Sequence, residues 1–132
     1  MIDHLSIPTT KYDETIAFYD ACLKAIGAER CVNMTAHWNP DWPEQRLCAY
    51  GVGGKPVFWI GEAKSSEGTR HIAFTADGVD AVKGFYDAGL ATGGSCNGVP
   101  GPREIYHPGY YGGFLIDPNG NNVEAVFHAF SG

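Results

Sequence analysis

The chain carries little positive charge. Nine lysines and arginines stand against fifteen aspartates and glutamates among its 132 residues, which gives a formal net charge of −6. Nucleic acids and anionic membranes are bound chiefly through clustered basic side chains, so we expect neither as a partner. No apolar run approaches the roughly 20 residues that a helix needs to cross a bilayer. Residues 1–8 contain no basic stretch followed by an apolar one, so we expect no signal peptide.

Cysteine is also sparse, and its positions form no metal-binding or redox motif. No two of the four cysteines are separated by only two residues; they are Cys22, Cys31, Cys48 and Cys96. Scattered cysteines in a chain of this length are typical of reduced, buried thiols rather than of a disulfide framework. We therefore expect a cytoplasmic protein in which the thiols have no chemical role.

What the sequence does contain is an internal repeat. Residues 18–23 read Phe-Tyr-Asp-Ala-Cys-Leu and residues 85–90 read Phe-Tyr-Asp-Ala-Gly-Leu, so five of six positions match at a separation of 67 residues. The same separation relates His4 to His71. A chance hexapeptide is seldom flanked in register by a further match, so we predict two modules, one of residues 1–64 and one of residues 65–132.

Each half of the repeat has the pattern of a β-α-β-β-β unit. Apolar and polar residues alternate from His4 and again from His71, which predicts a strand at each place. Apolar residues then recur at helical spacing, with Asp13 and Asp77 as expected N-caps and glycines at the ends. Further strands are predicted at 30–37, 46–51 and 56–61 in the first module and at 103–106, 111–117 and 121–128 in the second.

These elements predict an α+β protein in which the two tandem modules share a core. The aromatic residues of both helices, Phe18, Tyr19, Phe85 and Tyr86, recur at the spacing of a buried stripe. Asp117-Pro118-Asn119-Gly120 is a turn signal that predicts a hairpin between the last two strands. We expect the modules to pair into a cupped, mostly antiparallel sheet around a central site.

Three side chains are candidate metal ligands. His4 and His71 open equivalent strands, so the pseudo-symmetry of the repeat would bring them together at the junction of the modules. Glu124 alternates with apolar neighbours on the last strand, and a buried carboxylate requires a metal ion or a strong hydrogen-bonding partner. Two imidazoles and one carboxylate would leave positions open on Fe, Mn, Ni or Zn for a bidentate oxygen ligand.

The repeated modules, the histidine at the start of each and the closing Asp-Pro-Asn-Gly-Asn-Asn-Val-Glu resemble the vicinal oxygen chelate superfamily. This superfamily includes glyoxalase I, extradiol dioxygenases, fosfomycin-resistance transferases and bleomycin-resistance proteins. The resemblance implies a divalent metal held by His4, His71 and Glu124, with Glu124 also catalytic. It further implies a small-molecule substrate bound in the cup, and a homodimer in which the cups are completed across the interface.

The chain also departs from the pattern of these relatives. Glyoxalase I-like members have a further Glu ligand on the last strand of the first module, where a separation of 67 residues from Glu124 leads to Val57. Extradiol dioxygenases and fosfomycin-resistance enzymes carry a Tyr ten residues before the final Glu, where this chain has Phe114. Tyr110 and Tyr111 lie slightly earlier, and a different backbone path would be needed for either to replace it.

The segment 97–113 is rich in glycine, proline and tyrosine and is predicted to form a substrate lid. Within it, His107 is a candidate general acid or base and Tyr111 a candidate catalytic phenol, while Arg103 would pair with a carboxylate or phosphate. Packing of these side chains on the surface of a loop is the alternative. The candidate substrate-binding residues are Arg103, Tyr110, Phe114, Trp59 and Trp38.

Three functions fit this sequence. The first is a metal-dependent lyase or isomerase acting on a small oxygenated or thiol-conjugated substrate. The second is a non-catalytic protein that binds and sequesters a small molecule such as an antibiotic. The third is an extradiol dioxygenase with a relocated acid-base group. The presence or absence of a bound divalent metal separates the first from the second.

Overall fold

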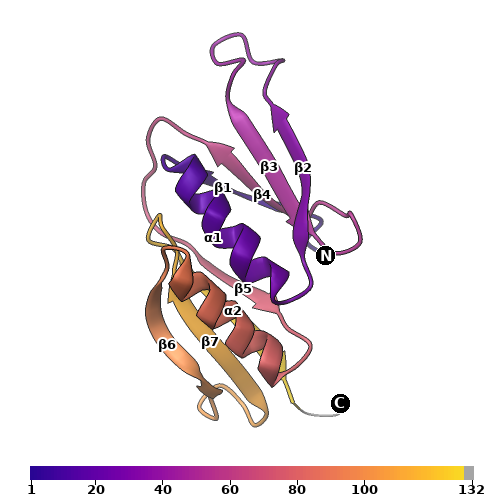
Figure 1. Cartoon of the computed structure of the whole chain (residues 1–132), viewed down its shortest axis with the longest axis vertical. Coiled ribbons are helices and arrows are strands. Elements are labelled where there is room, and N and C mark those ends of the chain that lie inside the picture. The colour runs from indigo at the N-terminus through magenta and orange to yellow at the C-terminus, as the bar shows by residue number, and fades with distance from the viewer. Residues whose placement is uncertain (130–132) are drawn as a thin grey trace.

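The computed structural model describes residues 1–129, in which two helices and eight strands follow the predicted order (Figure 1). The elements of the first module are β1 (Leu5–Thr9), α1 (Tyr12–Lys24), β2 (Glu29–Thr35), β3 (Arg46–Gly51) and β4 (Phe58–Glu62). Those of the second module are β5 (His71–Thr75), α2 (Val79–Ala91), β6 (Ser95–Pro102), β7 (Tyr110–Ile116) and β8 (Asn122–His128). The predicted α+β class and the repeated modules are confirmed.

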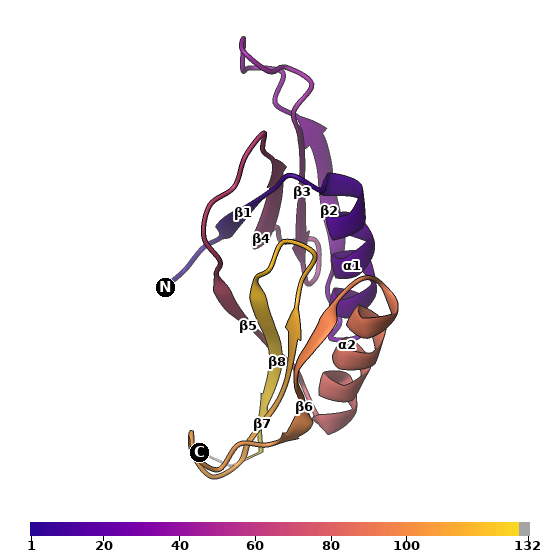
Figure 2. The same cartoon turned by 90° about the vertical axis from the view of Figure 1, so that its left-hand side faces the viewer.

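The strands form one four-stranded sheet in each module. Their orders are β1-β4-β3-β2 and β5-β8-β7-β6, so the repeat extends to the topology. The pairs β1–β4 and β5–β8 are parallel, and the remaining neighbours are antiparallel. Both helices lie on the same side of the molecule and pack against each other, which leaves the opposite faces of the two sheets without a helix (Figure 2).

Most strands lie within two residues of their predicted bounds, but the prediction of a strand at 103–106 is wrong. Those residues form a turn, and the strand is β6 at Ser95–Pro102. Its Gly-Val-Pro-Gly-Pro sequence is atypical of a strand. An edge strand accepts proline because its outward N–H groups have no partner in the sheet. The connection before β7 is therefore only residues 103–109.

The predicted helix ends are confirmed, but the prediction of Asp13 and Asp77 as N-caps is wrong. Gly27 and Gly93 follow the helices with φ of 86° and 102°, a left-handed conformation that glycine adopts without strain. The N-cap residues are Lys11 and Gly78, with no capping hydrogen bond from a side chain at either. Asp13 instead lies in the first turn of α1, where its charge interacts favourably with the helix dipole. Neither helix is long and apolar enough to cross a membrane.

The core lies between the helices and the sheets, and it crosses the boundary between the modules. Phe18, Tyr19 and Phe85 have no solvent exposure, as the aromatic stripes predict, and Tyr86 packs at the edge. Position 89 is where the repeated hexapeptides differ, since it holds glycine and its counterpart is Cys22. A Cβ at Gly89 would collide with the side chain of Leu115 and lie 3.1 Å from Phe18 of the other module. The glycine therefore permits close packing of the modules.

We expect Gly89→Ala to lower the free energy of unfolding by about 1–3 kcal/mol through overpacking. This loss outweighs the roughly 1 kcal/mol by which alanine is favoured over glycine in a helix. Urea unfolding followed by tryptophan fluorescence measures it. Gly84→Ala on the same helix is the control, because the only neighbour within 4 Å of its added Cβ is the Cβ of Ala25 at 3.3 Å. Equal stability of the two variants would contradict the packing role of Gly89.

A buried polar network joins the modules at the Asp117–Gly120 turn, which connects β7 and β8 as predicted. Both carboxylate oxygens of Asp117 accept hydrogen bonds: Oδ1 from the backbone N–H groups of Asn119 and Asn121, and Oδ2 from the Asn121 amide and from Tyr19 of α1. Asn119 also donates to Thr15 of the first module. The turn therefore holds the second module against α1.

Candidate functional site

The open face of the second sheet brings two of the predicted metal ligands into contact. His71 begins β5, and Glu124 lies in the middle of β8, the strand parallel to it. Nε2 of His71 is 2.8 Å from Oε1 of Glu124. On the other side of the ring, Nδ1 donates to the backbone carbonyl of Asn122 at 3.2 Å. Both ring nitrogens therefore face oxygen atoms that can only accept.

Glu124 is buried although it faces away from the helices. Its exposed fraction is 3%, because neighbouring side chains cover the carboxylate. Its second oxygen, Oε2, accepts a hydrogen bond of 2.5 Å from the hydroxyl of Tyr110 on β7. Burial raises the pKa of Tyr110 well above its ordinary value, and the hydrogen bond to Glu124 and the carboxylate charge raise it further. The phenol is thus protonated at neutral pH and acts as a donor.

A cavity of about 430 Å³ opens beside this pair. Aromatic rings supply half of its walls, and His71, Asn122 and Glu124 supply its polar groups. Among residues 1–129, the side-chain oxygen of Asn122 is the one buried side-chain polar atom that has no hydrogen-bond partner. The lining residues are His71, Tyr106, Tyr110, Phe114, Asn122 and Glu124.

The structure does not bring His4 to the other two predicted ligands. His4 lies just before β1 in the first module, is exposed, and contacts its neighbour Asp3 through Nδ1 at 2.6 Å. Within the described part of the chain, no three His, Cys, Asp or Glu side chains are grouped so that they could hold a metal ion. One copy of the chain therefore supplies two of the three predicted ligands at this place.

Of the two neighbouring tyrosines, Tyr110 reaches the site and Tyr111 does not. Alternate residues of a strand point to opposite faces, and Tyr111 packs against the hydrophobic core on the helix side of β7. The phenol beside Glu124 is thus Tyr110, which was predicted to bind substrate. A catalytic role for Tyr111 would require a side chain that faces the other way.

His107 and Arg103 lie next to the site rather than in it. The His107 ring stacks on His128 and meets the Tyr110 ring edge to face, with centroids 5.1 and 5.3 Å apart. Arg103 donates to the backbone carbonyls of Val99 and Pro102, and its guanidinium lies over the Phe114 ring. These contacts hold the 103–109 loop in place. The guanidinium N–H groups that Arg103 would need for binding a substrate are already used in them.

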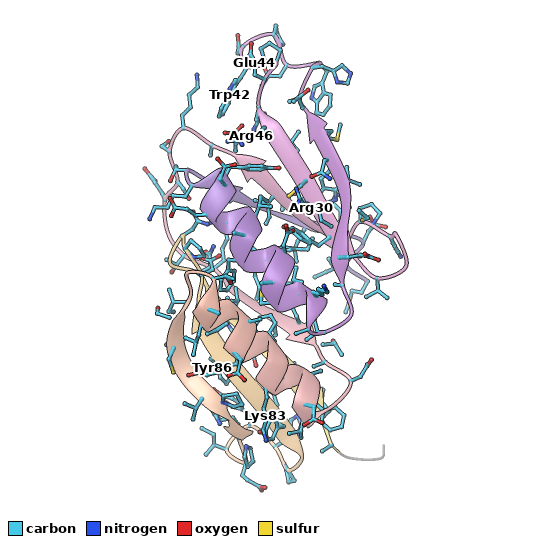
Figure 3. All side chains as sticks on the ribbon, viewed as in Figure 1. Arg30, Trp42, Glu44, Arg46, Lys83 and Tyr86 are labelled. Atoms are coloured by element: carbon cyan, nitrogen blue, oxygen red, sulfur yellow. The ribbon has the colours of Figure 1, made fainter. Side chains whose placement is uncertain are left out.

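The two predicted tryptophans lie in different surroundings. Trp38 belongs to the loop between β2 and β3, at the end of the molecule opposite the 103–109 loop (Figures 1 and 2). Its exposed fraction is 60%, and its ring contacts His37. Figure 3 shows Trp42 and Glu44 at the tip of the same loop. Trp38 is therefore remote from the cavity at Glu124 within one chain.

Trp59 occupies the position in the first module that Glu124 occupies in the second. Trp59 pairs with Ser6 across β1 and β4, as Glu124 pairs with Ala73 across β5 and β8. The assignment of Val57 as the counterpart of Glu124 is wrong, because the connection from β2 to β3 is longer than that from β6 to β7, which shifts the separation from 67 to 65 residues. The conclusion that this strand position lacks a carboxylate is unchanged.

A larger cavity, of about 610 Å³, lies between α1 and strands β2 and β3. Arg30 and Arg46 line it, and both are labelled in Figure 3. Arg30 is paired with Asp20, while Arg46 is paired with Asp13 and Glu62. Because carboxylates already neutralise both guanidinium groups, the smaller cavity at Glu124 is the better candidate for chemistry.

Two residues of the site were missed in the sequence. Asn122 stands two positions before Glu124 on β8, so strand alternation alone places both on one face. Tyr106 lies in the 103–109 turn, and nothing in its local pattern indicates that it would line the cavity.

Comparison with known proteins gives one family and one fold. The family model for the Glyoxalase/Bleomycin resistance protein/Dioxygenase superfamily matches residues 1–125. No curated protein matches the chain in sequence at a significant level.

Among solved structures, a glyoxalase/bleomycin resistance protein from Albidiferax ferrireducens T118 is 25% identical, with a TM-score of 0.73 over 93% of this chain and 95% of that one. A mutant of fosfomycin resistance protein FosX from Listeria monocytogenes, complexed with Mn(II) and 1S,2S-dihydroxypropylphosphonic acid, is 18% identical. Its TM-score is 0.67 over 99% of this chain and 93% of that one. A glyoxalase I mutant from Zea mays is 20% identical, with a TM-score of 0.71 over 98% of this chain and 45% of that one.

Proposed function

This chain belongs to the Glyoxalase/Bleomycin resistance protein/Dioxygenase superfamily, and we propose that it is a metal-dependent enzyme. The proposed activity is that of a lyase or isomerase acting on a small oxygenated or thiol-conjugated substrate. The observation that carries the proposal is the contact between His71 and the buried carboxylate of Glu124 at the wall of a cavity.

The donor chemistry of this pair fits a divalent cation. The carbonyl of Asn122 requires a proton on Nδ1 of His71, so Nε2 is the nitrogen that can offer a lone pair. Nε2 faces Oε1 of Glu124, and two acceptors at 2.8 Å repel each other unless a positive charge lies between them. Either a second proton on the ring or a metal ion satisfies this requirement. A metal-ligating histidine typically donates its other N–H to a carbonyl, as His71 does.

We place the third ligand, His4, on a second copy of the chain. His4 and His71 are equivalent in the repeat, yet His4 is exposed and does not join His71 and Glu124 in a group of ligands within the described part of one copy. β1 and β5 are edge strands of their sheets, and an apolar cavity of about 430 Å³ beside them is lined by Leu5 of β1 and by Ile72 and Phe74 of β5. A homodimer that covers this region would supply the missing imidazole, as the superfamily resemblance implies.

The residues around the pair have separable roles. A divalent ion bound here would act as a Lewis acid toward a substrate oxygen on which negative charge develops. His71 and Glu124 would hold that ion, and Phe114 and Tyr106 would pack against the apolar part of the substrate and exclude water. The side-chain oxygen of Asn122 has no partner among the described residues and would accept a hydrogen bond from a hydroxyl or amide of the substrate. His107 stays a predicted general acid or base.

Metal content tests this proposal directly. We expect the purified protein to carry about one divalent ion per chain by elemental analysis, and His71→Ala to lose it, because removal of one of few ligands weakens metal affinity severely. His37→Ala is the control, since His37 lies on the β2–β3 loop. The proposal would be excluded if the purified protein contains no metal and its thermal stability is unchanged by chelators and by added Mn(II), Fe(II), Ni(II) or Zn(II).

That last outcome would favour the second candidate, a non-catalytic binding protein. Three of the six residues that line the cavity are aromatic, and such walls suit a planar or aromatic compound. An extradiol dioxygenase is the third candidate, because Tyr110 supplies a phenol at the site. Colour development with catechols in the presence of Fe(II) and oxygen tests it. Absence of colour with every catechol in a panel would exclude it.

A further inference from the structure

We infer that Tyr110 is a positioning residue that fixes the orientation of the Glu124 carboxylate toward the metal ion, and that Gly112 provides the space for it. The inference rests on the proposed metal site, and it assigns a role that the superfamily pattern does not supply. Where that pattern places a tyrosine, this chain has Phe114.

The path of the Tyr110 side chain explains how a distant position reaches Glu124. Phe114 is the direct neighbour of Glu124 across β7 and β8, and Tyr110 is four residues earlier on the same face, opposite His128. Four residues of a strand span about 13 Å, so the two side chains must extend toward each other along the sheet. They meet over Gly112, where the hydroxyl of Tyr110 donates to Oε2 of Glu124 at 2.5 Å.

Gly112 makes this path possible because it has no side chain. A Cβ at this position would lie 3.1 Å from Cε1 of Tyr110 and 3.4 Å from Oε2 of Glu124. It would also lie 3.2 Å from the Phe114 ring. Contacts of 3.1–3.2 Å are tighter than ordinary packing, so even an alanine here requires the Tyr110 and Phe114 rings to shift by a few tenths of an ångström, and we expect that shift to weaken the bond from the phenol to the carboxylate.

The ring of Tyr110 is held in place on its other sides. Tyr106, His107 and His128 each meet it edge to face, with centroids 4.9, 5.3 and 5.4 Å away. Three rings from the 103–109 loop and the end of β8 therefore limit the rotation of the phenol. Its hydroxyl is presented at a fixed point.

The consequence is that the two oxygens of Glu124 have different roles. Oε2 is engaged by a neutral donor, and Oε1 is directed at Nε2 of His71. A neutral donor satisfies the buried carboxylate without cancelling its charge, so that charge is available to a cation beside His71. Partners of this kind orient a ligand, and their loss typically costs about 10- to 100-fold in metal affinity.

The test is titration of the metal-depleted full chain with Mn(II), with free Mn(II) measured by electron paramagnetic resonance. We expect Tyr110→Phe to weaken Mn(II) binding by about 10-fold or more. Gly112→Ala should weaken it similarly, although it keeps the phenol. Tyr111→Phe is the matched control, because that ring lies on the core side of the same strand. Thermal unfolding of each metal-depleted variant shows whether the fold is retained.

Visible absorption of the Co(II)-loaded proteins provides a second measurement, which a purely structural role would leave unchanged. Reorientation of the carboxylate should alter the spectrum of Tyr110→Phe and Gly112→Ala but not that of Tyr111→Phe. If wild-type protein binds neither ion, the proposed function fails and this inference fails with it. If wild-type protein binds Mn(II), and Tyr110→Phe binds it within twofold with an unchanged Co(II) spectrum, the metal site stands and the role of Tyr110 is overturned.

Discussion

A heterodimer of two metal-free variants, His4→Ala and Glu124→Ala, is expected to recover about half of the wild-type metal content per chain, because one of its two symmetric sites is intact. Each variant alone should bind no metal. In the heterodimer, the Glu124→Ala chain supplies an unchanged His4 to the unchanged His71 and Glu124 of the other chain. The remaining site combines both defects.

Coexpression of the two variants with different affinity tags, followed by purification on both tags, isolates the heterodimer for elemental analysis. The control is the pair His71→Ala and Glu124→Ala. In each proposed site, His71 and Glu124 come from the same chain. Each site of this second heterodimer therefore lacks one ligand, and we expect no metal to be recovered. Absence of recovery in the first heterodimer, or failure to isolate one at all, would refute a site shared between copies. A site formed within one chain predicts no recovery in either pair.

The repeat explains why the fold was predictable. A duplicated hexapeptide and the in-register His4 and His71 define two similar units, and strand and helix periodicity then specifies β-α-β-β-β for each. The elements with clear periodicity lie within a few residues of their predictions. β6 was missed because Gly98, Pro100 and Gly101 remove the apolar alternation on which the prediction depends. An edge strand such as β6 tolerates proline and glycine better than an internal strand, so it can form without a regular alternation of apolar residues.

The candidate site was predictable only in part. The alternation of residues along a strand gives the direction of each side chain, but it does not show which distant elements lie close together. Alternation along β8 places Glu124 away from the helix-facing Val123 and Ala125, and parallel pairing brings β5 alongside it. The repeat also suggested that His4 would join them, but equivalent positions in a pseudo-symmetric pair need not lie close together. They converge only if the modules face each other, and here the modules pack through their helices.

The reach of Tyr110 depends on a feature that no periodicity reports. A tyrosine four residues from the expected position would normally be out of range of Glu124. The absent side chain of Gly112 lets the ring lie along the sheet. In the same way, the length of the loop between β2 and β3 decides that Trp59, rather than Val57, corresponds to Glu124. Such details follow from packing and loop length, which a single sequence does not specify.

Replacement of Asp117 by alanine is expected to lower the free energy of unfolding by about 3–5 kcal/mol. The exposed fraction of Asp117 is 3%, and its carboxylate accepts four hydrogen bonds. Alanine would leave the buried Tyr19 hydroxyl and the Asn121 amide without this acceptor, at about 1–3 kcal/mol for each unsatisfied group. Because domains of this size are typically stable by about 5–15 kcal/mol, the variant should be close to unfolding at 37 °C.

The matched variant is Tyr19→Phe, which removes the bond between the modules at 2.6 Å and retains the three donors from the turn to Asp117. We expect it to cost about 1–2 kcal/mol. Urea unfolding of metal-depleted protein measures both, since a bound ion would add its own stabilisation to the folded state. In the double variant, the cost of losing Tyr19 should largely disappear, because its acceptor is already gone. Additive losses, or a loss below about 1 kcal/mol for Asp117→Ala, would mean that apolar packing between α1 and α2, rather than this turn, holds the two modules together.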